Sequence, residues 1–191
     1  MGADKSAKRY RGKGAVLYEE KRAGKNKWIL ENKGVEELLP IQGITTVLDV
    51  PVGTGRFFYL YQDRGFKATG VDTSPDMLKE AKKKGMKDLH LGDIRKLPFP
   101  DKSFDMAVCI RLFGWFTPDE VRQALGELSR VATGLIIGIR TKEGAPFCKS
   151  ESLWNHAHVD FLKWIKEIGY QIDAAYCVGN KGNIIYRLCN A

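Results

Sequence analysis

The chain has 191 residues, of which 43% are hydrophobic and 28% are charged, as is typical of one globular domain with its own core. It holds no apolar run near the roughly 18 to 20 residues of a membrane-spanning helix, and its polar, basic start lacks the apolar segment of a signal peptide. We therefore expect a cytoplasmic protein with no membrane span.

The net charge of +8 is concentrated near the start of the chain, because residues 1–33 hold ten Lys or Arg and four acidic residues. We divide the chain into a basic N-terminal arm, residues 1–24, and one domain, residues 25–191. Such an arm can attract a nucleic acid or an acidic substrate. It can equally be a solvated, partly disordered leader, and the charge alone leaves both readings open.

Neither the cysteines nor the histidines form a metal-binding pattern. His156 and His158 form an H-x-H pair, which is weak evidence for a metal. The four cysteines are scattered with no C-x-x-C pair, so we expect reduced thiols and no metal site. They are Cys109, Cys148, Cys177 and Cys189.

Strand and helix signals alternate along the domain. The β-branched run 45–50 is too short for a helix and is typical of a buried parallel strand. Residues 117–120 form a capping box before an apolar pattern with helical spacing. Strands are predicted over residues 45–50, 67–71, 88–91, 104–110, 134–139, 170–178 and 183–188. Helices are predicted over residues 28–39, 57–64, 75–84, 118–131 and 159–168.

Five strand–helix alternations predict an α/β fold with a mostly parallel sheet and helices on both faces, because right-handed crossovers leave few other arrangements. The turn 179–182 joins the last two strands as an antiparallel hairpin, which brings the expected sheet to seven strands. Ligands of such sheets bind beyond the carboxyl ends of the strands, so functional residues should follow each strand directly.

The first predicted strand ends in a glycine loop, residues 49–55, which read D-V-P-V-G-T-G. Gly53 and Gly55 let the backbone turn sharply and approach a ligand, although a structural turn would use the same pair. A dinucleotide-binding loop would have a third glycine where Phe58 stands. The carboxylate of Asp49 would repel a pyrophosphate, but it would suit a ligand that carries an ammonium and a sulfonium.

Two more acidic residues follow the next two strands. Asp72 stands some 20 residues after the glycine loop, where a carboxylate can accept both hydroxyls of a ribose. The alternative role of helix cap is already filled by Ser74. Asp93 could accept a hydrogen bond from an adenine amino group, with Ile94 against the ring.

The ordered motifs D-x-P-x-G-T-G, G-V-D-x-S-x-x-M-L and G-D-x-x-x-L-P-F-P-D-x-S-F-D-x-V resemble those of class I S-adenosylmethionine (SAM)-dependent methyltransferases, above all the small type 11 branch. The resemblance covers residues 45–140, and the closing helix and hairpin also fit. It implies a Rossmann-like fold, SAM as the cofactor and methyltransferase activity. One departure is that Pro51 and Val52 replace the commoner small residues of the loop.

The resemblance also implies roles for single residues. Asp49 and the glycine loop would hold the methionine part of SAM, Asp72 the ribose and Asp93 the adenine, with Met77 packed on the adenine face. The complete set of cofactor-binding residues that it implies is Asp49, Pro51, Gly53, Thr54, Gly55, Asp72, Thr73, Met77, Asp93, Ile94 and Ile110.

Residues 110–116 would face the transfer site. They lack the N/D-P-P-Y/F tetrad of amino-directed nucleic-acid methyltransferases and the Pro-Cys pair of cytosine-C5 enzymes. Their aromatic side chains could enclose a small organic acceptor or a stacked base, or they could be ordinary core. Tyr18, Arg22 and Trp28 could form a lid over SAM, and Arg22 or Arg111 could meet a carboxylate. The predicted acceptor-binding residues are Tyr18, Arg22, Arg111, Phe113 and Trp115.

An acceptor that must lose a proton needs a general base, for which His156 is a candidate, although a histidine of a surface loop would look the same. The sequence favours methyl transfer to a small molecule and identifies neither the acceptor nor its reacting atom. An RNA- or protein-directed methyltransferase that uses the basic arm is an alternative. A SAM-using enzyme of another kind, such as a SAM lyase, is a second, and Phe58 and Asp49 disfavour a nicotinamide-dependent oxidoreductase.

Overall fold

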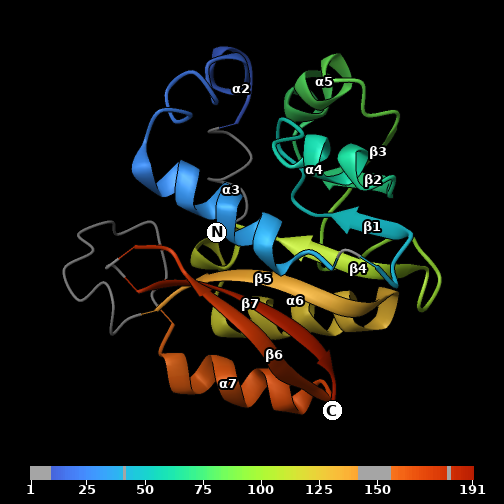
Figure 1. Cartoon of the computed structure of the whole chain (residues 1–191), viewed down its shortest axis with the longest axis vertical. Coiled ribbons are helices and arrows are strands. Elements are labelled where there is room, and N and C mark those ends of the chain that lie inside the picture. Colours follow the sequence, from blue (N-terminus) through green and yellow to red (C-terminus); the bar gives the residue numbers. More distant parts are fainter. Residues whose placement is uncertain (1–9, 41, 142–155, 180–181) are drawn as a thin grey trace.

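The structure is a computed structural model and describes residues 10–40, 42–141, 156–179 and 182–191. Its strands form one sheet with the order β3-β2-β1-β4-β5-β7-β6 (Figure 1). The first five strands in this order, β3-β2-β1-β4-β5, pair in parallel, and β7 pairs antiparallel with both β5 and β6. The strands are β1 Thr46–Asp49, β2 Lys67–Asp72, β3 Asp88–Leu91, β4 Phe104–Cys109, β5 Ala132–Arg140, β6 Tyr170–Cys177 and β7 Asn183–Asn190.

Helices cover both faces of this sheet. Buried residues of α3 and α4 pack on one face, and buried residues of α6 and α7 pack on the other, where Figure 1 shows these two helices side by side. The helices are α2 Lys13–Val16, α3 Asn26–Leu38, α4 Phe58–Asp63, α5 Pro75–Lys83, η1 Phe113–Trp115, α6 Pro118–Val131 and α7 His158–Glu167.

The predicted α/β fold is confirmed, including the closing antiparallel hairpin, and each predicted element is found within about two residues of its expected ends. The capping box is also present: Thr117 Oγ1 accepts from the backbone N–H of Glu120, and that carboxylate accepts from the N–H of Thr117. Two elements were not predicted, α2 and η1. They hold four and three residues, too few to produce a helical hydrophobic period.

The strand order reverses between β1 and β4, which both pair with neighbours in parallel. The chain leaves β1 and β4 toward helices that cover opposite faces, so the backbone diverges there and leaves room beyond the strand ends. The glycine loop, the tip of β2 and the segment after β4 all lie at this edge of the sheet.

Part of the third sequence motif belongs to the opposite edge, where it has a structural role. Asp105 Oδ2 accepts hydrogen bonds from the backbone N–H groups of Thr45 (2.7 Å) and Thr46 (2.9 Å), and from both of their hydroxyls. One carboxylate thus provides the acceptor for the hydrogen-bond donors at the start of β1, and it fixes β1 against β4. These bonds explain the third aspartate of the motif without any ligand.

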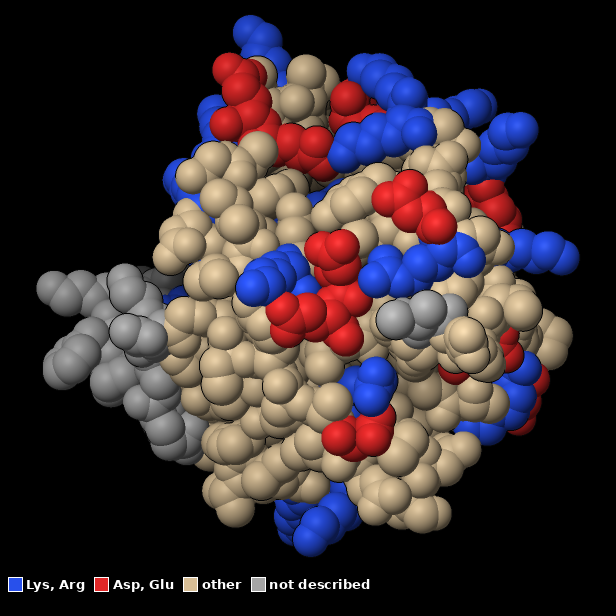
Figure 2. Space-filling model, viewed as in Figure 1, with Lys and Arg blue, Asp and Glu red and all other residues tan. Residues whose placement is uncertain are grey.

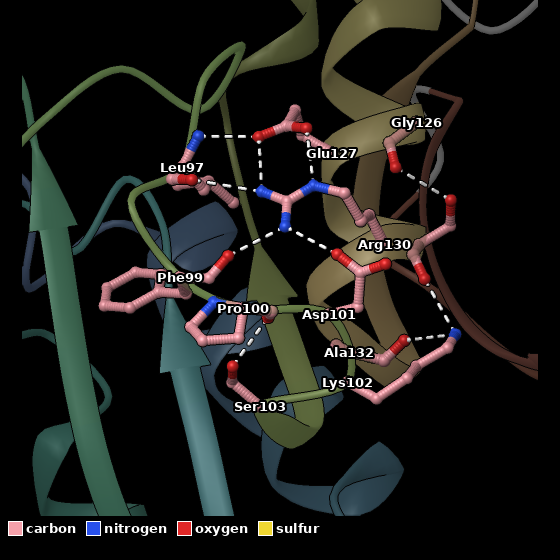
Figure 3. Close-up of polar contacts among 11 residues, drawn as sticks. Leu97, Phe99, Pro100, Asp101, Lys102, Ser103, Gly126, Glu127, Arg130 and Ala132 are labelled. Atoms are coloured by element: carbon pink, nitrogen blue, oxygen red, sulfur yellow. Dashed lines mark hydrogen bonds and ion pairs between the residues drawn. The ribbon is translucent and has the colours of Figure 1, made fainter.

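The loop 97–103 of the same motif is held by Arg130 of α6 (Figure 3). The guanidinium donates to the carbonyls of Leu97 (3.0 Å) and Phe99 (2.7 Å) and to the carboxylate of Asp101 (2.9 Å). Its Nε and Nη2 donate to Glu127, whose Oε2 in turn accepts from the backbone N–H of Leu97. The two carboxylates therefore raise the pKa of Arg130 and keep it charged.

Replacing Arg130 with alanine removes these bonds and leaves the carbonyls of the loop without partners. We expect the free energy of unfolding to fall by about 1–3 kcal/mol, measured by urea denaturation. Lys79→Ala is the control, since Lys79 forms only an exposed ion pair with Asp76 and should change stability by less than about 0.5 kcal/mol. Equal effects of the two substitutions would contradict the structural role of Arg130.

Within the described residues, no helix combines the length and the apolar character that crossing a membrane requires. Three cysteines, Cys109, Cys177 and Cys189, are free thiols in the described part of the chain, and burial raises the pKa of the Cys109 thiol. Cys148 lies outside the described residues.

Candidate functional site

A cavity of about 360 Å³ lies at the carboxyl ends of the parallel strands. The glycine loop after β1 and the tip of β2 line one half, together with residues that follow β3. The segment after β4, the end of β5 and the start of β7 line the other half. The edge of the sheet at which the sequence predicted a site is therefore hollow.

The two glycines of the loop have different roles. Both have left-handed backbone, with φ of 55° at Gly53 and 68° at Gly55. A Cβ at Gly55 would lie 3.2 Å from the Cα of Ala81, so this glycine lets the loop pack closely on α5. A Cβ at Gly53 would meet nothing within 4 Å, and Gly53 lines the cavity, so the space beside it is open to a ligand.

Asp72 lies at the tip of β2, lines the cavity and is only 7% exposed. Its Oδ2 accepts from the backbone N–H of Gly53 (2.9 Å), and its Oδ1 accepts from the N–H of Ser74 (2.8 Å). Burial raises the pKa of this carboxyl, and the backbone hydrogen bonds oppose that rise. Each carboxylate oxygen can accept a second hydrogen bond, so Asp72 retains capacity for a pair of ligand hydroxyls.

Asp49 has a different position from the one that the resemblance implied. Its side chain is 2% exposed, it does not line the cavity, and its Oδ2 accepts from the Tyr61 hydroxyl at 3.1 Å. Burial raises the pKa of Asp49 to about 8, against the effect of the Tyr61 hydrogen bond, and nearby Asp72 raises it further. Asp49 is thus buried and is not part of the lining of the cavity.

The raised pKa makes the stability of the fold depend on pH. An unfolded aspartate loses its proton near pH 4, whereas folded Asp49 keeps it up to about pH 8. The unfolded chain therefore binds fewer protons in this window, and this group lowers stability as the pH rises, by up to about 1.4 kcal/mol per pH unit. Asparagine does not titrate, so Asp49→Asn should gain stability relative to the parent between pH 5 and pH 8.

Urea denaturation of both proteins at these two pH values measures the change. A difference in free energy of unfolding that is the same at pH 5 and pH 8 would show that Asp49 titrates normally.

Apolar side chains complete the first half of the cavity. Met77 and Ile94 are each 3% exposed and line the cavity with Ile110. Asp93 also lines it, but its carboxylate already accepts from the backbone and the guanidinium of Arg95, with Arg95 Nη2 to Oδ2 at 2.5 Å. Arg95 Nη1 donates in turn to Glu120 (2.6 Å), so Asp93 belongs to a fixed network of charged residues.

Residues 10–24, which we call the lid segment, pack against the loop and α5. The hydroxyl of Ser74 donates to the carbonyl of Tyr10 (2.6 Å), and the N–H of Gly12 donates to Asp76 (2.9 Å). Glu19 accepts from the hydroxyl of Thr54 (2.5 Å) and pairs with Lys84. From residue 10 on, the basic arm is thus part of the folded structure.

Three residues of the lid segment, Tyr10, Tyr18 and Arg22, line the cavity, and the last two are the ones that the sequence predicted. The guanidinium of Arg22 lies 4.1 Å from the centre of the Tyr18 ring, and the Tyr18 ring contacts Trp28 edge-on. Trp28 itself does not line the cavity; its ring stacks on Arg56 at 3.7 Å. The boundary between residues 24 and 25 remains an interpretation.

Replacing Glu19 with alanine removes the contacts from the lid segment to Thr54 and Lys84. Amide hydrogens of the lid segment should exchange at least several times faster, because the opening free energy of the segment falls. Glu20→Ala is the matched control, since Glu20 is the exposed neighbour on the same segment. Mass spectrometry measures this exchange. Equal exchange rates of the lid segment in the two variants would show that Glu19 does not hold the lid.

The second half of the cavity has an aromatic wall and several basic side chains. Phe113, Trp115 and Phe116 are buried around η1 and line the cavity. Arg111, two residues after β4, also lines it and has a positive φ of 67°. Such a backbone is uncommon for a residue other than glycine and occurs often at functional sites.

Sequence reasoning missed four charged residues that line this half. Glu31 of α3 accepts from Arg56 Nη1 at 2.8 Å and lies 3.4 Å from Arg111 Nε, and Lys27 is its i,i+4 partner. Arg140 ends β5 at the same place. The i,i+4 pair was visible in the sequence, but which residues it would meet depends on how α3 packs on the sheet.

His156 does not line the cavity. Its Nε2 lies 2.9 Å from the carbonyl of Phe113, and its ring contacts Trp164 of α7 edge-on. Burial lowers the pKa of this imidazole, which favours the neutral form. These contacts give His156 a structural role on the outer side of η1, and its position offers no support for a general base.

Among residues 10–40, 42–141, 156–179 and 182–191, no group of three or more His, Cys, Asp or Glu is arranged to hold a metal ion. The other predicted site residues, from the loop to the aromatic wall, converge on the cavity, apart from Asp49, Gly55 and His156.

Comparisons with known proteins agree with this geometry. Residues 47–133 match a family model described as a methyltransferase domain. Malonyl-[acyl-carrier protein] O-methyltransferase of Pectobacterium atrosepticum is 31% identical over 119 residues, which are 61% of this chain and 46% of that protein. Demethylmenaquinone methyltransferase of Deinococcus radiodurans is 39% identical over 94 residues, 46% of this chain and 38% of that protein. The chain spans less than half the length of these two relatives.

The fold also matches a solved structure along its whole length. Magnesium protoporphyrin IX methyltransferase from Synechocystis PCC 6803, crystallised with bound SAH, superposes with a TM-score of 0.81 at 15% identity and with 100% coverage of both chains. Residues 47–133 thus match a methyltransferase domain, and the whole chain shares the fold of a SAH-binding methyltransferase structure. The family model and the relatives agree with the resemblance to the small type 11-like branch of class I SAM-dependent methyltransferases.

Proposed function

We propose that this chain binds SAM in the first half of the cavity and transfers its methyl group to a small organic acceptor in the second half. The observation that carries the proposal is the single cavity at the carboxyl ends of the strands. Its first half is lined by Asp72, Met77 and Ile94 beside the open space at Gly53. A hydrophobic slot with one buried carboxylate suits an adenosine, whose ring is apolar and whose ribose donates two hydroxyls.

The residues present fit the cofactor. The space at Gly53 would receive the methionine part, and Asp72 would accept the ribose hydroxyls. Met77 and Ile94 would enclose the adenine. SAM itself supplies an activated methyl group on a sulfonium.

The protein's part in this reaction is to bind, orient and exclude water. Methyl transfer is an in-line displacement, so fixing donor and acceptor in one closed cavity can contribute on the order of 7–11 kcal/mol. The lid segment, tied to Thr54 and Ser74, covers the loop and keeps water from the reacting atoms. The wall formed by Phe113, Trp115 and Phe116 would orient the acceptor.

A small acceptor is favoured over a polymer by the charge distribution at the end of the molecule formed by α2 and α5. On the face that Figure 2 shows, Lys and Arg stand there among Asp and Glu. Three lysines of this end, Lys79, Lys83 and Lys84, pair with acids. A nucleic acid is attracted by unpaired basic residues gathered into a patch, whereas acidic residues stand among the basic ones at this end of the molecule.

Asp72→Ala should weaken binding of S-adenosylhomocysteine (SAH) at least tenfold, because two ribose hydrogen bonds to a charged group are lost. Isothermal titration calorimetry measures this affinity. Asp63→Ala, at the exposed end of α4, is the control. Because Asp72 also binds the N–H groups of Gly53 and Ser74, circular dichroism must show that the variant is folded, and Asp72→Asn offers a second variant of the same shape. Unchanged affinity in folded Asp72→Ala would refute the assignment.

The transfer itself is tested by incubating the protein with radiolabelled SAM and a cell extract and by identifying the labelled product. Consumption of SAM without any acceptor would instead indicate a lyase.

A further inference from the structure

The two halves of the cavity differ in charge. The strand order places the carboxylates of Asp72 and Asp93 at the tips of β2 and β3, on one side of the switch point. Arg111 follows β4 and Arg140 ends β5, on the other side. A ligand that fills the cavity therefore has an acidic wall at one end and a basic wall at the other.

The basic wall is a cluster of four cations, Lys27, Arg56, Arg111 and Arg140, around one carboxylate, Glu31. Glu31 is 4% exposed and lies within 4 Å of three of them: Arg56 (2.8 Å), Arg111 (3.4 Å) and Lys27 (3.7 Å). Burial lowers the pKa of Lys27, Glu31 opposes this, and both Arg111 and Arg140 lower it further. The cluster thus has an excess of positive charge that its own acid does not balance.

Two nitrogens of the cluster have no partner among the residues that the structure describes. Arg111 Nη1 and Arg140 Nε are buried and form no hydrogen bond with any of them. By contrast, all three donor nitrogens of Arg56 are used, by Asn32, Glu31 and the carbonyl of Trp28. A buried guanidinium nitrogen without an acceptor is destabilising, so such a donor in a native fold requires an explanation.

The backbone holds Arg111 in this place. Its φ of 67° lies in the left-handed region, which is unfavourable for a residue other than glycine. The surrounding chain fixes it there, between buried Ile110 of the strand end and the helical turn η1. In this conformation Arg111 lines the cavity, and its Nε lies 3.4 Å from Glu31.

We infer that the methyl acceptor is an organic anion whose carboxylate or phosphate accepts hydrogen bonds from Arg111 and Arg140, while its apolar body lies against Phe113 and Trp115. This inference rests on the proposed function, because it names the acceptor of that reaction. Planar guanidinium groups bind both kinds of oxyanion through paired N–H donors. The aromatic wall beside them excludes water and strengthens this attraction.

The cofactor's own methionine carboxylate is the rival occupant of the cluster. It is distinguished by 5′-methylthioadenosine, which keeps the adenosine and the sulfur but has no amino-acid part. Replacing a residue that holds the cofactor's carboxylate must weaken the binding of SAH and leave the binding of methylthioadenosine unchanged. Replacing a residue that holds the acceptor must leave the binding of both compounds unchanged.

The experiment uses the full chain saturated with SAH and measures its melting temperature with benzoate, with phenyl phosphate and with neutral benzamide, each against sodium chloride of equal ionic strength. An anion that binds the folded state raises the melting temperature. The parent protein should be stabilised by benzoate or phenyl phosphate and not by benzamide. The stronger of the two anions tells a carboxylate from a phosphate site.

Arg111→Gln and Arg140→Gln should each reduce the apparent affinity for the anion at least tenfold, with SAH and methylthioadenosine affinities within about twofold of the parent by calorimetry. Arg122→Gln is the control, because Arg122 pairs with Asp119 and Glu167 outside the cavity. It should keep the full anion effect.

The inference is overturned if SAH binds the parent but neither anion stabilises it, while the proposed function stands. It is also overturned if the variants lose SAH affinity and keep that for methylthioadenosine. Failure of SAH to bind the parent refutes the proposed function itself, and the inference with it.

Discussion

The cavity depends on one buried carboxylate among several cations. Glu31 brings α3 against the glycine loop through Arg56 and against the segment after β4 through Arg111. A buried charge is tolerated only when it is paired and hydrogen-bonded, so α3, the loop and the β4 end are fixed relative to one another. Glu31 carries one negative charge and pairs with three cations. The remaining positive charge can therefore attract an anionic ligand in the cavity.

Local sequence patterns predicted most of the fold and one half of the site. The β-branched run of β1, the capping box of α6 and the glycines after β1 are signals that need no knowledge of distant residues. The parallel topology then requires the strand tips to meet, so the amino-acid sequence alone places Asp72, Met77 and Ile94 at one edge of the sheet. The acidic half of the cavity is thus encoded almost entirely in the order of the strands.

The remaining features depend on tertiary packing that no spacing reveals. Whether a carboxylate lines the cavity or is buried away from it depends on how its strand packs, and Asp49 is buried with its Oδ2 bonded to the hydroxyl of Tyr61. His156 contacts Phe113 because of how η1 packs on α7. The basic cluster draws on α3, the loop, β4 and β5, so its members are scattered along the chain as single charged residues that resemble a solvated surface.

The lid segment has a consequence for how the molecule assembles. The ribosome synthesises this segment early. Its residues Gly12 and Glu19, however, bond to Asp76 and Lys84, which follow them by 64 and 65 residues. Asp76 belongs to α5 and Lys84 directly follows it. The lid segment therefore cannot take its folded position before that helix is in place, and a nascent chain passes through a stage in which residues 10–24 exist without the surface that holds them.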